Sequence, residues 1–286
     1  MSSPARDPAG HAAIQAVVDG TLADPHAVLG AHPVPGGVVV RAFRPEAVAV
    51  RVRAGGGLSN GGGDGPQDAQ APALELEQVH PGGVFAGELA NATLPLVYEL
   101  EVVYGDGNTF TMTDPYAFAP TLGELDIHLA GEGRHEEIYE HLGAHVREHE
   151  GVSGTAFAVW APSARTVSVV GDFNFWDGRR HPMRLRRECG VWELFLPGVL
   201  IGARYKFELR DSAGSLLPQK ADPCARQSEL RPATASAVAE AEFTIGALLQ
   251  MLRRVPIAND EGLLVGRELG SAVVGLVGMT STAKPL

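Results

Sequence analysis

The sequence of 286 residues has few of the residues that mark secreted, redox or nucleic-acid-binding proteins. It contains 2 cysteines, 3 tryptophans and 6% aromatic residues. The two cysteines, Cys189 and Cys224, are too few for a disulfide framework, so we expect reduced thiols in a cytoplasmic protein. Lysine plus arginine number 23 against 34 aspartates plus glutamates, for a net charge of −11. This acidic balance argues against a nucleic-acid partner, which would favour basic residues.

Long apolar runs and cofactor motifs are also missing. The most apolar late stretch, residues 262–278, is interrupted by Arg267 and Glu268, so we expect no membrane-spanning segment and no membrane partner. The first residues do not resemble a secretory signal peptide. The glycine runs lack the Gly-Lys-Ser/Thr of a phosphate-binding loop, and no Gly-x-Ser-x-Gly elbow occurs. We therefore predict no cofactor.

Glycine and proline are abundant instead. With 35 glycines and 20 prolines, these two types make up about 19% of the chain, against an average of roughly 12%. So many turn formers favour short strands over long helices. Seven of the eleven residues 55–65 are glycine, which we interpret as a solvated hairpin insertion.

The chain contains an internal repeat. Six short motifs recur in the same order at an offset of a little over one hundred residues, which indicates duplication. The paired segments are 29–32 with 142–145, 38–45 with 155–162, 47–52 with 166–170, 83–85 with 190–192, 98–100 with 205–207, and 114–116 with 222–224.

Each copy contains short β runs separated by turn residues, the pattern of a β-sandwich. The fold class is therefore predicted as all-β, with two tandem sandwiches. Between the copies, Ile138, Leu142 and Val146 recur at spacings of four and predict a short helix over 136–148. Trp160 and Trp192 lie within strand-like runs, and we assign both to the core.

Most titratable residues have a structural explanation. His141, His145 and His149 would share a face of the predicted helix, but no glutamate follows the first histidine as a metallopeptidase requires, and His145 has a repeat counterpart in His32. We assign no metal ligand. Four aspartates sit beside turn residues, where short acidic side chains cap backbone N–H groups; they are Asp114, Asp172, Asp177 and Asp222.

The best surface candidate is the run 173–178, Phe-Asn-Phe-Trp-Asp-Gly, which follows a predicted strand. The indole of Trp176 offers a flat partner for the C–H face of a sugar ring. Lys206, on the exposed face of a later strand, could donate hydrogen bonds to sugar hydroxyls, and Asn174 is the third candidate ligand. The alternative, that Trp176 only covers the sandwich edge, remains open at this point.

Several long motifs resemble bacterial 1,4-α-glucan (glycogen) branching enzymes. The likeness covers roughly residues 20 to 238. The similar segments are 114–118, 122–126, 131–135, 142–145, 157–162, 167–178, 181–184, 190–194, 205–208, 220–223 and 231–236.

The resemblance implies two immunoglobulin-like β-sandwiches joined by a short helical linker. It places a flexible N-terminus at 1–20, an N-terminal β-sandwich at 21–120, a linker at 121–150 and a family-48 carbohydrate-binding module at 151–238. It implies an α-glucan such as glycogen or amylose as partner, bound weakly through Trp176 and Lys206. Glycan-binding members add a second tryptophan just after the Lys206 strand, but residues 212–218 contain Leu216 and Leu217 instead.

The resemblance also implies a catalytic (β/α)8 barrel, whose aspartate and glutamate transfer an α-1,4-glucan segment to form an α-1,6 branch. Residues 239–286 do not match its start and are too few to build it. We expect this divergent tail to be a frameshifted, truncated or replaced end, and we assign no catalytic residue. The alternatives are a stand-alone glucan-binding module and the N-terminal part of a trehalohydrolase or debranching enzyme.

Overall fold

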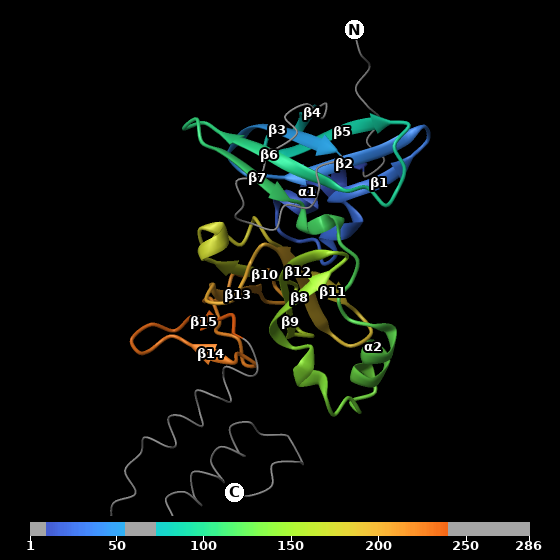
Figure 1. Cartoon of the computed structure of the whole chain (residues 1–286). Coiled ribbons are helices and arrows are strands. Elements are labelled where there is room, and N and C mark those ends of the chain that lie inside the picture. The colour runs from blue at the N-terminus through green and yellow to red at the C-terminus, as the bar shows by residue number, and fades with distance from the viewer. Residues whose placement is uncertain (1–9, 55–72, 240–286) are drawn as a thin grey trace, which may run out of the picture. The chain divides into compact units, whose positions relative to one another are not determined.

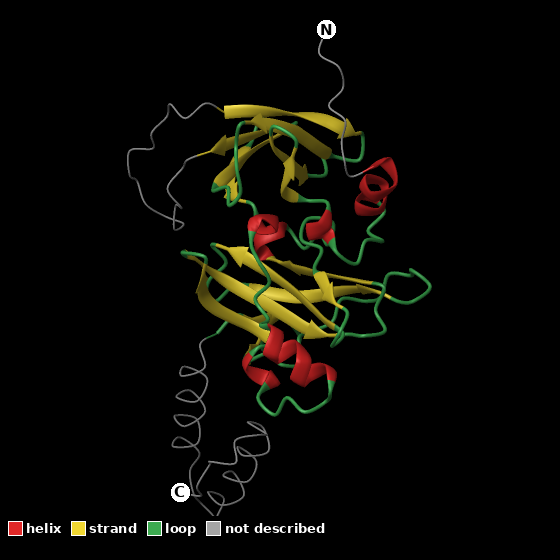
Figure 2. Ribbon diagram, turned by 90° about the vertical axis from the view of Figure 1, so that its right-hand side faces the viewer, coloured by secondary structure: helices red, strands yellow, loops and turns green. Residues whose placement is uncertain are grey.

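The computed structural model describes residues 10–54 and 73–239, and these form a mostly β structure with short helices (Figure 2). The elements described below belong to one compact unit that ends at Val238. The glycine-rich run 55–65 and nearly all of the predicted tail lie outside the described residues. Within the described ranges, no helix is long and apolar enough to cross a membrane.

The first copy is an antiparallel sheet of seven strands, preceded by helix α1 (Gly10–Val18) and the short η1 (Pro25–Ala27). The strand order is β1-β2-β5-β4-β3-β6-β7. The bounds are β1 Gly30–Val34, β2 Gly37–Phe43, β3 Ala47–Ala54, β4 Ala73–His80, β5 Val84–Ala90, β6 Tyr98–Tyr104 and β7 Thr109–Thr113.

Strand β4 connects the two halves of this sheet. Its first residues, 73–76, pair with β3, whereas residues 77–80 pair with β5. The two layers of the predicted sandwich are therefore continuous through one strand. Side chains between the layers form a core that includes Val40, Phe85 and Leu100.

The second copy has two separate antiparallel sheets (Figure 1). Between the copies lie η2 (Pro115–Ala117), α2 (Glu124–Gly131) and η3 (Ile138–Glu140). One sheet has the order β11-β12-β9-β8 and the other β10-β13-β15-β14. The bounds are β8 Gly143–His149, β9 Val152–Trp160, β10 Thr166–Gly171, η4 Asp172–Asn174, β11 Arg184–Arg186, β12 Val191–Pro197, β13 Arg204–Arg210, β14 Gln227–Ser228 and β15 Ser236–Ala237.

The two copies share buried polar contacts as well as strand order. The hydroxyl of Tyr98 donates to Asp114 at 2.6 Å, and Tyr205 donates to Asp222 at the equivalent place in the second copy. Each aspartate also accepts a backbone N–H two residues on, which is the capping role that we predicted for both. Burial raises the pKa of both carboxyls. The repeat therefore includes the same buried hydrogen-bonding unit twice.

The helix predicted over 136–148 is wrong. The structure has a single 3-10 turn, η3, followed by strand β8, while the helix of this region is α2. Gly143 has a φ of +105°, and a Cβ there would lie 3.1 Å from the carbonyl oxygen of Cys224. Such a residue ends the turn and starts the strand. Pairing of β8 with β9 along all seven residues outweighs the four-residue apolar spacing.

The flexible N-terminus predicted for 1–20 does not hold for residues 10–18. They form α1, whose Ile14 and Val17 are buried in the main core cluster. Ile14 and Val17 lie three positions apart in this short helix, so they share one face. This face supplies the packing that a helix of nine residues needs to be stable.

The two strand tryptophans have different environments. Trp192 is fully buried, as predicted, and its indole donates to the carbonyl of Ala161 at 3.0 Å. Trp160 was wrongly assigned to the core, because it is 61% exposed. Ala158, on the same face of β9, packs in the apolar cluster that includes Ile127 of α2. Trp160, at the end of β9, does not belong to that cluster.

Candidate functional site

The loop that carries Trp176 begins where β10 ends. Gly171 pairs with Tyr205 of β13, and a Cβ at Gly171 would lie 2.3 Å from the carbonyl oxygen of Arg204. Only glycine allows this close approach between the strands. The chain then leaves the sheet through η4 and crosses the outward face of β13.

Asn174 holds this loop in shape. Its side-chain oxygen accepts from the backbone N–H of Gly171 at 2.9 Å, and its amide nitrogen donates to the carbonyl of Val169 at 2.9 Å. The same nitrogen lies 2.9 Å from Nδ1 of His181. Asn174 is buried, with its amide engaged on both sides. Asn174 therefore stabilises the loop that carries Trp176.

Two bulky residues of the loop have left-handed backbone angles. Phe175 has a φ of +58° and Trp176 a φ of +60°. Non-glycine residues avoid this region, and strain of on the order of 1–3 kcal/mol each persists only where surrounding contacts enforce it. The result is an aromatic pair turned outward: Phe175 is 70% exposed, with the guanidinium of Arg180 5.3 Å from its ring centre.

The Trp176 indole is oriented by a charged pair. Its N–H donates to Oδ1 of Asp172 at 3.3 Å, and Arg204 donates to both oxygens of that carboxylate at 2.8 and 3.1 Å. The hydrogen bond from Arg204 holds the pKa of Asp172 below its usual value. The half-buried ring is thus held at its nitrogen edge.

Lys206 lies on the same outward face of β13. Tyr205 and Phe207 are buried, so the alternating residues Arg204, Lys206 and Glu208 point away from the core. The Trp176 loop touches this face on both sides of Lys206: Asp172 binds Arg204, and Gly178 packs directly against Glu208.

The structure therefore brings Trp176 and Lys206 to one surface. Nζ of Lys206 donates to the hydroxyl of Thr234 at 2.7 Å, which leaves further donor capacity on its ammonium group. On the neighbouring return segment, Leu216 is 54% exposed and forms a bridge with Arg210. This side chain is aliphatic, so it offers no second stacking ring.

The three histidines considered for a metal do not converge. His145 and His149 lie on strand β8, and their rings contact the carbonyls of Leu142 and Ala119. His141 instead lies 3.3 Å from Asp126. Sequence spacing missed this contact, because its partner belongs to α2 rather than to a common helix with His141.

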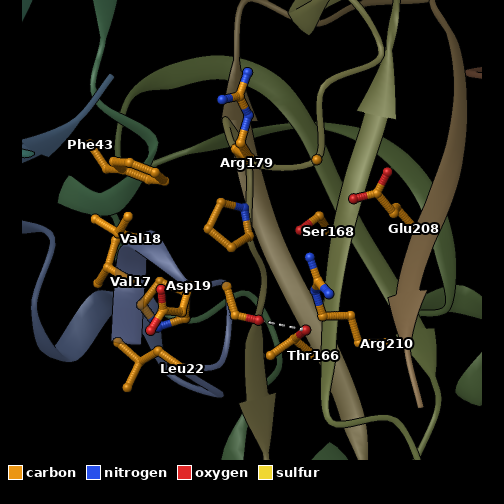
Figure 3. A pocket seen from close by; sticks show the side chains of 14 residues that line it. Val17, Val18, Asp19, Leu22, Phe43, Thr166, Ser168, Arg179, Glu208 and Arg210 are labelled. Carbon is orange, nitrogen blue, oxygen red and sulfur yellow. Dashed lines mark hydrogen bonds between the residues drawn. The ribbon is translucent and has the colours of Figure 1, made fainter. Parts of the chain in front are cut away.

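A cavity of about 110 Å³ lies near the loop and was not predicted (Figure 3). Val17, Val18 and Leu22 line one side, while Thr166 and Arg210 line the other. The hydroxyl of Thr166 donates to the carbonyl of Gly20 at 3.2 Å across its edge. Gly178 and Glu208 also line this cavity, so the Trp176 loop forms part of its rim.

Comparison with known protein families divides the chain into two domains. Residues 10–116 match the family described as "alpha-1,4-glucan branching enzyme GlgB, N-terminal domain". Residues 141–225 match "Carbohydrate-binding module 48 (Isoamylase N-terminal domain)". The two matches correspond to the two copies of the repeat.

Individual proteins that are similar to the chain carry the name of the same enzyme. The chain is 48% identical over 248 residues to the 1,4-alpha-glucan branching enzyme GlgB of Myxococcus xanthus, covering 86% of this chain and 32% of that protein. It is 52% identical over 226 residues to the protein of the same name from Rubrobacter xylanophilus, covering 79% and 29%. The chain thus spans about a third of the length of these relatives. Among solved structures, apo pullulanase from Klebsiella pneumoniae has a TM-score of 0.29 at 18% identity, covering 81% of this chain and 25% of that one.

Proposed function

The chain comprises the N-terminal domain and the carbohydrate-binding module 48 of 1,4-α-glucan branching enzymes, and from this premise we propose that it recognises α-glucan in glycogen biosynthesis. In this proposal its partner is glycogen or amylose, and the reaction that it serves is the transfer of an α-1,4-glucan segment to form an α-1,6 branch. A cytoplasmic location is part of the proposal and agrees with the free thiols of Cys189 and Cys224.

The observation that carries the proposal is the surface formed by Trp176 and Lys206. A flat indole fixed at its nitrogen edge by Asp172 suits stacking on the C–H face of a glucose ring. The ammonium of Lys206 would donate to hydroxyls of the same glucan. Asn174 acts by positioning the loop through Val169 and Gly171.

We propose that binding by this surface is weak. Leu216 provides an aliphatic side chain where a second ring would add stacking. By analogy with a base on an aromatic side chain, one ring contributes about 1–3 kcal/mol. A surface with a single ring and one cation is therefore expected to bind each glucan chain weakly.

Co-sedimentation of the purified chain with glycogen tests the proposal. Trp176→Ala should weaken binding by about 5- to 150-fold, the equivalent of the lost stacking. Trp160→Ala is the matched control, because Trp160 is an exposed tryptophan of the same copy, on a different sheet. No retention of the wild type, or equal losses in the two variants, would contradict the proposed surface.

A separate assay addresses catalysis. We propose that residues 10–239 serve as accessory modules without branching activity of their own, because they match the N-terminal domain and a carbohydrate-binding module. Incubation of the chain with amylose, followed by a count of α-1,6 branches, should give no new branches. Clear branch formation would refute this part and would leave the glycogen-binding result unaffected.

A further inference from the structure

Three ligand-type side chains converge in the segment between the two sandwiches. Nε2 of His135 lies 3.0 Å from Oδ1 of Asp126, and Nε2 of His141 lies 3.3 Å from the same oxygen. The three atoms all lie within 4.8 Å of one another. The two imidazole rings meet edge to face, with centres 5.6 Å apart.

These separations fit one metal ion. A tetrahedral ion with bonds of about 2.0–2.1 Å has neighbouring ligand atoms ~3.3 Å apart. The two nitrogen–oxygen separations lie close to that value, and the two histidine nitrogens lie within 4.8 Å of each other. Two imidazole nitrogens and one carboxylate oxygen form a donor set suited to zinc and its neighbours rather than to calcium or magnesium, which prefer oxygen ligands.

The ligands are held in place by their own segments. The second oxygen of Asp126 accepts the backbone N–H of Gly123 at 3.1 Å, so the carboxylate is fixed as a cap of α2 while Oδ1 faces the histidines. His141 closes the turn η3 through a bond from its N–H to the carbonyl of Ile138 at 3.0 Å. Ile127 and Leu142, next to two of the ligands, pack in one apolar cluster.

Access and charge also favour a cation. The side chain of His135 is 8% exposed, and those of Asp126 and His141 are each 23% exposed, so the site is shielded but reachable. Around it, residues 123–141 contain six acidic residues, against one arginine, Arg134. Such a local excess of negative charge attracts metal ions.

We propose that Asp126, His135 and His141 form a three-ligand site for a divalent transition ion of the Zn²⁺ class. The ion would tie α2 to η3, immediately before β8 begins. With three protein ligands, a fourth position is completed by water. The competing explanation is that both histidines only donate hydrogen bonds to the Asp126 carboxylate.

Titration of the full chain with Co²⁺ and with Zn²⁺ separates these explanations. The wild type should bind one ion at this site, with the visible absorption of tetrahedral Co²⁺, and Zn²⁺ should displace it. His141→Gln should weaken binding by at least about 10- to 100-fold, the range that loss of even a supporting residue of a metal site costs. The matched control is His128→Gln, since His128 is an exposed histidine of α2, the helix that carries Asp126, and contacts Glu132 rather than the cluster.

His135→Gln should have the same effect as His141→Gln, and circular dichroism would check that each variant is folded. If His135→Gln does not fold, His141→Gln decides alone, because its side chain is more exposed. The proposal is overturned if the wild type gives no tetrahedral Co²⁺ spectrum. It is equally overturned if His141→Gln binds as tightly as His128→Gln.

Discussion

The loop of Trp176 depends on a histidine that stays neutral, and this has a measurable pH dependence. Nδ1 of His181 lies 2.9 Å from the amide nitrogen of Asn174 and serves as its acceptor only when unprotonated. Burial, together with the nearby positive charges of Arg44 and Arg180, lowers the pKa of His181 to about 3, and Asp177 opposes this shift only in part. In the unfolded chain the pKa of a histidine is about 6.5.

The sign follows from proton binding. Below pH 6.5 the unfolded chain binds a proton at His181 and the folded chain does not, so stability is greatest above pH 6.5 and falls as the pH decreases toward 3. Between pH 8 and pH 5 this single group changes the free energy of unfolding by about 2 kcal/mol.

The assay is urea unfolding of the wild type and of His181→Gln at both pH values. Glutamine keeps an acceptor for Asn174 and does not titrate, so other groups cancel in the difference between the two proteins. The stability advantage of the wild type should be about 2 kcal/mol smaller at pH 5 than at pH 8. A difference that is the same at both pH values would refute the neutral state of His181.

Other substitutions test other parts of the account. Glu193→Ala removes a buried carboxylate that binds Arg186 at 2.8 Å, and should lower the free energy of unfolding by about 3–5 kcal/mol in urea titrations. Tyr205→Phe deprives Asp222 of one of its donors and should cost about 1–3 kcal/mol in the same measurement; an unchanged midpoint would contradict a structural role for this pair. Leu216→Trp adds an exposed ring beside the proposed surface and should tighten glycogen co-sedimentation by about 5- to 150-fold, whereas an unchanged affinity would place the site elsewhere.

The repeat was the part of the fold that the sequence revealed best. Motif pairs such as 98–100 with 205–207 are short, but they carry the buried tyrosines whose hydroxyls bind Asp114 and Asp222. Periodicity was less reliable. The apolar spacing over 136–148 predicted a helix, but strand pairing with β9 decides that segment, and pairing depends on a partner that a local pattern does not contain.

The same limit applies to exposure and to the sites. Trp160 and Trp192 look alike in the sequence, but Trp192 packs in the main core cluster, whereas Trp160 at the end of β9 is 61% exposed. Composition at a strand end correctly placed Trp176 on a loop, but the burial of Asn174 was not visible from its exposed neighbours. The Asp126–His135–His141 cluster was missed, since its spacing follows no regular element.

The central claim is that glucan binds at Trp176. Because the chain has 3 tryptophans, its spectrum of ¹⁵N-labelled indole groups should contain three resonances, which single substitutions assign. On titration with maltoheptaose, the account predicts a shift of the Trp176 resonance alone, while those of exposed Trp160 and buried Trp192 stay in place. A spectrum in which Trp160 shifts and Trp176 does not, or in which none moves at saturating sugar, would contradict it.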